Sequence, residues 1–222
     1  MQDLLDSAFS VKLSTCNKKD MKTLKLIPWV YCVFAALSLT ACLKDVPADN
    51  SLTPQEIQTA FKSVEGHYTG HVIYNEADLG SGLEAKLDTA SVTWDLNTDS
   101  TLTIHGFPTR FLAKHISDAP IREALEAQPD QDMNCYIGFI KIDPVTFLVN
   151  PYTDAFNLLY DGKTREVQIG FLVNNYVSYG AWSAEKKLLQ MQIVEGGIFI
   201  DGQLQSALLP SSIPFLIEGS RE

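Results

Sequence analysis

Cysteine is scarce in this sequence. Only Cys16, Cys32, Cys42 and Cys135 occur among 222 residues, and Cys135 alone lies in the part with a strand-like pattern. A single thiol has no intramolecular partner, so this part is not a disulfide scaffold. Its stability must come from the burial of apolar side chains.

Basic residues are also few, and they form no run. Residues 42–222 contain 12 Lys and Arg against 24 Asp and Glu. Nucleic acids reward clustered positive charge, so the composition excludes a nucleic acid as a partner. The acidity indicates a soluble surface under mild self-repulsion.

The sequence lacks an apolar run that would span a membrane comfortably. The uncharged stretch from Leu26 to Leu39 is shorter than the roughly 20 residues that a transmembrane helix needs. Met21, Lys22 and Lys25 precede it, which is the layout of a secretory signal peptide. The stretch therefore indicates export.

A small-residue site follows the apolar stretch. Leu39, Thr40, Ala41 and Cys42 resemble the lipobox of bacterial lipoproteins. The resemblance implies cleavage after Ala41 and acylation of Cys42, which would anchor the protein in a membrane. Leu43 then follows the lipidated cysteine, which is compatible with an outer-membrane lipoprotein of the cell envelope, on either its periplasmic or its surface side.

These signals divide the chain into four parts. Residues 1–20 are expected to be an upstream extension from a mis-assigned start, and residues 21–41 a lipoprotein signal peptide. Residues 42–52 are polar and without periodicity, which is typical of a tether. Residues 53–222 are long enough for a single β-rich domain with a sizeable core.

The domain opens with a helical pattern. Thr53 can cap a helix that begins at Pro54, where a missing N–H costs nothing. Apolar residues then recur with helical spacing up to Gly66, where β-branched and aromatic residues take over. Residues 117–128 predict one further helix, in the middle of the domain.

The rest of the domain reads as strands and turns. Residues 91–107 alternate in polarity on both sides of a polar turn, with Trp94 predicted on the core face and Asp95 outward. Turns are predicted at 143–144, 161–162 and 196–197 because their residues favour tight turns. The pattern predicts a mainly β fold, an antiparallel meander of about nine or ten strands forming a lipocalin-like barrel or a sandwich.

Two resemblances accompany this pattern. Gly66, His67 and Tyr68 follow the first helix and resemble the opening of lipocalin-type barrels, with Tyr in place of the usual Trp. A lipobox, a short tether and a lone acidic β domain also resemble the uncharacterised small lipoproteins of Bacteroidota. The second resemblance implies a location and no chemistry.

No arrangement of residues predicts catalysis, a metal site or a cofactor. His67 and His71 lie four residues apart in a strand, about 13 Å from each other, so they cannot share one ion as neighbours. Asp95 and Asp99 are expected on a strand surface and in a turn, and Cys135 is expected to be an inert core thiol. We therefore expect a protein that is not an enzyme.

Aromatic residues are the remaining signal. Tyr176, Tyr179 and Trp182 lie close together near asparagines and a glycine, and they are the candidate ligand-binding residues, although core packing would use the same side chains. Two functions stay open. The first is a lipid-anchored binding module for a small apolar or glycan-like ligand, and the second is an envelope interaction or assembly protein that docks a membrane protein partner.

Overall fold

The computed structural model describes residues 51–75 and 87–222. The described residues belong to one compact unit that begins at Ser51. The predicted cleavage after Ala41 and the predicted lipidation of Cys42 lie outside these residues. So do the signal peptide, the upstream extension and nearly all of the tether.

The first described element is helix α2, Pro54–Val64. Thr53 caps it as predicted: its hydroxyl accepts from the Glu56 N–H, and the Glu56 carboxylate accepts from the Thr53 N–H at 2.8 Å. This reciprocal capping box satisfies donors that a helix start otherwise leaves open. The buried face of α2 presents Ala60, Phe61 and Val64 to the core.

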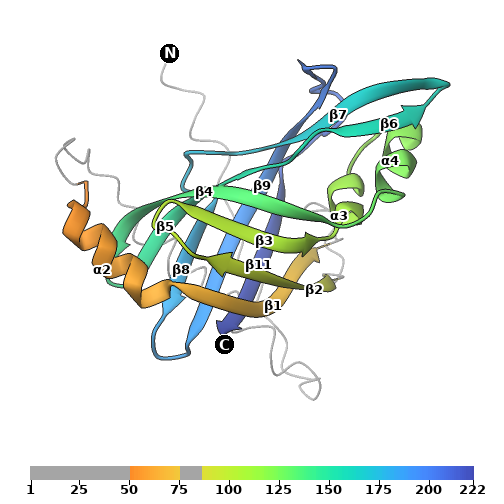
Figure 1. The fold of residues 1–222 in the computed structure, drawn as a ribbon. Helices are drawn as coiled ribbons and strands as arrows, with labels where there is room; N and C mark the ends of the chain where they lie inside the picture. The colour runs from red at the N-terminus through yellow and green to blue at the C-terminus, as the bar shows by residue number, and fades with distance from the viewer. Residues whose placement is uncertain (1–50, 76–86) are drawn as a thin grey trace, which may run out of the picture. The chain divides into compact units, whose positions relative to one another are not determined.

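Eight strands close into an antiparallel barrel (Figure 1). They follow the order β11-β1-β2-β3-β4-β5-β8-β9, and β9 pairs with β11 to complete the ring. The lipocalin-like alternative of the predicted fold is thereby confirmed. The barrel strands are β1 (Gly66–Asn75), β2 (Leu87–Leu96), β3 (Thr101–Phe107), β4 (Gln131–Ile142), β5 (Val145–Tyr152), β8 (Tyr179–Ser183), β9 (Leu188–Ile200) and β11 (Ile213–Arg221).

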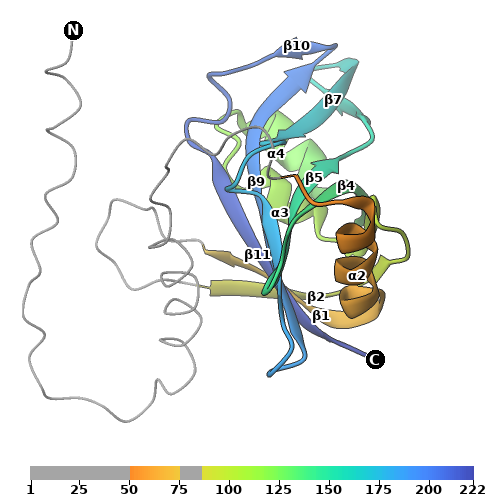
Figure 2. The ribbon, with the colours of Figure 1, turned by 90° about the vertical axis from the view of Figure 1, so that its left-hand side faces the viewer.

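A small sheet continues from the barrel (Figure 2). The last residues of β9 pair with β7 (Lys163–Phe171) and with the two-residue β10 (Gln203–Leu204), and β7 pairs with β6 (Phe156–Tyr160). The predicted turn at Gly196–Gly197 is therefore wrong, because β9 runs through both glycines as it passes from the barrel into this extension. The strands also do not all pair in sequence order, since β5 pairs with β8 and not with β6.

Short helices lie at both ends of the barrel (Figure 1). Helix α2 packs against β4 and β5, and α3 (Thr109–Ala113) and α4 (Ala119–Glu126) lie at the other end. The predicted middle helix, residues 117–128, is α4, with Asp118 as its N-cap, and α3 is a further short helix that the sequence pattern did not predict. Within residues 51–75 and 87–222, no helix has both the length and the apolar character that a membrane crossing requires.

Aromatic side chains fill the barrel. Trp94 is fully buried, as predicted, and its ring stacks on Tyr68 with 5.4 Å between centroids. Gly219 makes room for this indole, because a Cβ there would lie 2.6 Å from the Trp94 ring. The interior is therefore a packed core of side chains, as in other small barrels.

Local turn chemistry agrees with the prediction in two places. Asp161 and Gly162 have φ angles of 50° and 72°, as the two-residue turn between β6 and β7 requires. The turn at Asp143–Pro144 joins β4 to β5. Eleven strands are present in the part of the chain that the structure describes, against the nine or ten predicted.

Candidate functional site

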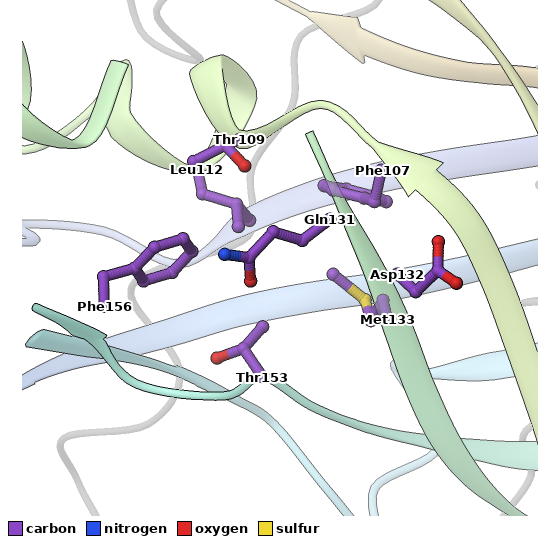
Figure 3. Close-up of a pocket in the computed structure, with 8 residues that line it drawn as sticks. All are labelled: Phe107, Thr109, Leu112, Gln131, Asp132, Met133, Thr153 and Phe156. Carbon is purple, nitrogen blue, oxygen red and sulfur yellow. The ribbon is translucent and has the colours of Figure 1, made fainter. Parts of the chain in front are cut away.

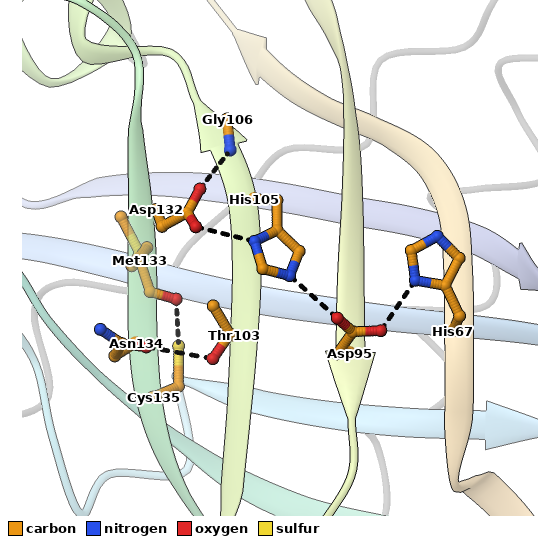
Figure 4. A network of polar contacts seen from close by, with 9 residues as sticks. All are labelled: His67, Asp95, Thr103, His105, Gly106, Asp132, Met133, Asn134 and Cys135. Carbon is orange, nitrogen blue, oxygen red and sulfur yellow. Dashed lines mark hydrogen bonds and ion pairs between the residues drawn. The ribbon is translucent and has the colours of Figure 1, made fainter.

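Four polar side chains form a continuous row across the outer face of β1 to β4 (Figure 4). His67 Nδ1 lies 2.7 Å from Asp95 Oδ1, and the second oxygen of Asp95 lies 3.0 Å from His105 Nε2. His105 Nδ1 in turn lies 2.8 Å from Asp132 Oδ2. We call this row, His67, Asp95, His105 and Asp132, the His–Asp row.

An irregularity in β3 accompanies the end of the row. The pairing of β3 with β4 shifts between Ile104 and Phe107, and Gly106 has a φ of 67°, a left-handed conformation that glycine adopts at little cost. The Gly106 N–H donates to Asp132 Oδ1 at 3.1 Å. Asp132 is thus held by the backbone of β3 as well as by His105.

The row favours the charged form of each group whose pKa is perturbed. Hydrogen bonds from His67 and then His105 lower the pKa of Asp95. The pKa of His105 is raised by its hydrogen bond to Asp132 and, to a smaller extent, by its hydrogen bond to Asp95. The pKa of Asp132 is lowered by its hydrogen bonds to His105 and to the Gly106 amide. The two carboxylates beside His105 therefore favour its protonated form.

The hydrogen bonds of the row join imidazoles, carboxylates and one backbone amide, and they fasten β1, β2, β3 and β4 to one another on the outer face. No group of three or more His, Cys, Asp and Glu side chains in the described ranges is placed to hold a metal ion. His71 lies further along β1, where it pairs in register with Ser91 and Glu218.

A pair of exposed tyrosines lies beside the row, on β4 and β5. The rings of Tyr136 and Tyr152 stack with 5.3 Å between centroids and 24° between planes. Tyr136 is 59% exposed and Tyr152 43% exposed. Asp132, Asn134 and Tyr136 are alternate residues of β4, so they follow one another along its outer face.

Asparagine side chains surround the tyrosine pair. Asn150 is the register partner of Tyr136, and its amide is tied to Asn174 by two hydrogen bonds of 3.2 and 2.6 Å. Asn134 accepts a hydrogen bond from the Thr103 hydroxyl at 3.0 Å. These contacts fix the amides, and we call Tyr136, Tyr152, Asn134, Asn150 and Asn174 the tyrosine face.

The three predicted ligand-binding residues do not form one cluster. Trp182 is buried in the barrel, where its ring meets Tyr68 edge-on at 6.2 Å. Tyr179 alternates with the inward-facing Gly180 and Trp182, so it lies on the opposite, outer face of β8. Tyr176 is 73% exposed in the connection between β7 and β8.

Sequence reasoning missed the Tyr136–Tyr152 pair. Both residues occupy outward positions in two strands that join at the Asp143–Pro144 turn. Regular counting from that turn pairs Tyr136 with Pro151 and leaves Tyr152 on the opposite face, and the register shift between Phe139 and Lys141 is what brings both rings to the outer face. Alternation within residues 91–107 needed no such shift, and it correctly placed Asp95 outward.

The pocket drawn in Figure 3 is very small. It lies between α3, β4 and the connection before β6, with Phe107, Met133, Thr153 and Phe156 in its lining. Its volume of about 10 Å³ is close to the least that one water molecule needs. This pocket has no room for an organic ligand.

Some buried polar atoms of the barrel have no hydrogen-bond partner. They include Trp94 Nε1, Ser178 Oγ and Glu195 Oε1. Glu195 is 1% exposed, and burial raises the pKa of its carboxyl well above the usual range. Burial also raises the pKa of the Cys135 thiol, which agrees with the prediction of an inert core cysteine.

The closed barrel and its packed interior define an antiparallel β-barrel domain. The tyrosine face and the His–Asp row both lie on its outer surface. Residues 63–200, more than half of the chain, match the domain of unknown function DUF4840, and the chain belongs to this family. The matched segment runs from the end of α2 to the end of β9. No curated protein and no solved structure gives a significant match.

Proposed function

We propose that the domain is a binding module that takes a glycan-like ligand on its tyrosine face. The observation that carries the proposal is the stacked and exposed pair of Tyr136 and Tyr152. Large aromatic rings are normally buried in a core, so two that stack on each other in solvent are available for a partner. Their mutual stacking holds both rings in place before a ligand binds.

The surrounding groups fit the chemistry of sugars. An aromatic ring can pack against the apolar face of a sugar ring, while amides and carboxylates take hydrogen bonds from hydroxyl groups. Asn134 and Asn150 flank the pair with amides that are already oriented. The acidic balance of the domain favours neutral over anionic glycans, because like charges repel.

A ligand inside the barrel has weaker support. Aromatic side chains such as Trp94 and Tyr68 occupy the interior, and the pocket beside Phe107 has a volume of about 10 Å³. The outer face offers more contact area than this pocket. We therefore favour the glycan-like ligand over the small apolar one.

A glycan microarray tests the proposal. We expect the purified domain to bind a subset of neutral oligosaccharides and the double variant Y136A/Y152A to lose that binding. Both rings are about half exposed, so the double variant should keep its fold, which thermal melting would check. Absence of binding by the unaltered domain would overturn the proposal.

Tyr176→Ala is the matched control. It removes an exposed aromatic ring from the connection between β7 and β8 and leaves the stacked pair intact. We expect it to bind the same glycans as the unaltered domain. If Y176A loses binding and Y136A/Y152A retains it, the ligand lies at the predicted Tyr176 cluster and the tyrosine face is the wrong site.

We also infer that the module is tethered to the outer membrane of the cell envelope through acyl chains on Cys42. The support is the lipobox that ends at Cys42. Nine residue steps separate Cys42 from Ser51, and an extended chain of that length spans at most about 30 Å. Mass spectrometry of the membrane-extracted protein tests the anchor, because any N-terminus other than acylated Cys42 would refute it.

Docking of a membrane protein partner is the second candidate function. It is favoured by the exposed leucines of the extension, Leu159 at 69% and Leu204 at 57% exposure. A photo-crosslinking residue at position 159 should capture one reproducible membrane protein in intact cells if this function holds. A matched probe at the exposed Asn157 of the same strand serves as the control, and equal capture from both positions would count against docking.

A further inference from the structure

Gly138 lies in the middle of β4 on the outer face of the barrel, two residues after Tyr136. A Cβ built at this position meets no atom within 4 Å. Its φ lies outside the left-handed region, so the backbone does not require a glycine. The missing side chain leaves an open notch in the surface of the sheet.

The other described glycines have a structural reason that Gly138 lacks. Gly106, for example, has a positive φ, and a Cβ at Gly70 would lie 2.1 Å from a backbone oxygen of β11. The pairing of Gly138 with Leu148 is regular, and the irregularity of β4 comes only after Phe139. A glycine inside a strand weakens the strand, and it often marks a place where a ligand approaches the backbone.

The notch adjoins the free face of the Tyr136 ring. Tyr152 stacks on one face of that ring and pairs in register with Asn134, which precedes Tyr136 on β4. The other face of Tyr136 is therefore turned along β4 toward Gly138. Leu148, the register partner of Gly138, bounds the notch on the side of β5.

We propose that Gly138 forms the floor of a subsite in which one neutral pyranose ring stacks on the free face of Tyr136. This inference rests on the proposed glycan-binding function and makes it more specific. The open space above Gly138 lets the sugar ring come down to the strand, so that it contacts the whole aromatic face. Leu148 adds an apolar edge to the contact.

The test fills the notch without touching the tyrosines. Gly138→Val adds a β-branched side chain that strands favour, and Gly138→Ala adds a single methyl group. We expect both variants to melt at or above the temperature of the unaltered domain. Against the neutral oligosaccharides that the unaltered domain retains on the array, we expect G138A to bind more weakly and G138V to lose at least tenfold in affinity.

Ser91→Val is the matched control, since it adds the same side chain at an exposed outer position of β2. We expect its binding to equal that of the unaltered domain. If G138V binds normally while Y136A/Y152A does not, the subsite is wrong and the glycan-binding face stands. If G138V is unfolded, G138A decides: normal binding by a folded G138A overturns the subsite. If the unaltered domain binds no glycan, both the function and the subsite fail.

Discussion

Removal of the buried carboxyl at position 195 should change how stability depends on pH. Glu195 lies on the inner face of β9, where its register partners are Phe171 and Ile213. It is 1% exposed, one of its oxygens has no hydrogen-bond partner, and the rise in its pKa comes from burial alone. The variants of interest are Glu195→Gln, which cannot ionise, and Glu195→Met, which is apolar.

The sign of the effect follows from the direction of the pKa shift. Above the ordinary carboxyl pKa of about 4.3, Glu195 is ionised in the unfolded chain, while the folded chain keeps it protonated up to its raised pKa. Unfolding then releases a proton, so the free energy of unfolding falls as the pH rises through this window. The slope for one proton is at most about 1.4 kcal/mol per pH unit.

Urea denaturation between about pH 5 and 8 measures this slope. Relative to the unaltered protein, both E195Q and E195M should gain stability as the pH rises, by up to about 1.4 kcal/mol per unit. The new side chain can also lower the free energy of unfolding by an amount that does not depend on pH, as a buried amide would. Such a cost shifts the whole curve of stability against pH and leaves its slope unchanged. Glu185→Gln, at an exposed position, controls for the loss of one charge. Equal slopes for E195Q and the unaltered protein would refute the reasoning.

Three further changes test other parts of the fold. Arg221→Ala removes two hydrogen bonds to carbonyls at the end of α2, and urea denaturation should show a loss of about 1–2 kcal/mol. Gly219→Ala puts a Cβ 2.3 Å from the Thr69 carbonyl oxygen and 2.6 Å from the Trp94 ring, so it should destabilise the domain by about 1–3 kcal/mol, and an unchanged melting curve would contradict this close approach. His105→Gln removes a group whose raised pKa stabilises the fold below about pH 6.5, and this contribution is lost as the pH rises through the pKa of the folded state. Because His105 is partly exposed, the difference between H105Q and the unaltered protein should be no more than about 1 kcal/mol at low pH and should shrink toward high pH.

Features that depend on neighbouring residues were predictable from the sequence. Thr53 and Pro54 start α2, and Asp161 and Gly162 form a tight turn, because each depends on interactions within a few residues. The inward position of Trp94 followed from alternation along one strand. These features needed no knowledge of the partner strands.

Features that depend on strand pairing were not predictable in the same way. Gly196 and Gly197 resemble a turn locally, but pairing with β7 keeps β9 continuous through Gly197. The sequence likewise does not show that β5 pairs with β8, since residues 153–178 lie between them. Long-range pairing outweighs local turn preference when it satisfies more backbone hydrogen bonds.

In the candidate site, too, local alternation was predictable from the sequence and the pairing between strands was not. Alternation placed Asp95 on the outer face, but its bonds to His67 and His105 join residues 28 and 10 positions away. The Tyr136–Tyr152 pair depends on the register of β4 against β5. A change of register by one residue would turn one ring of the pair to the other face.

The sequence alone was sufficient for the mainly β class, the helix caps and the tight turn at Asp161–Gly162, because these depend on composition and on contacts within a few residues. The tertiary structure decided that the barrel is packed with aromatic side chains, that Trp182 lies inside it, and that the exposed tyrosines gather on β4 and β5. The physical reason is that closure of the sheet sets which side of every strand faces the core. Closure in turn depends on the pairing of β11 with β1, the last and the first strand of the domain.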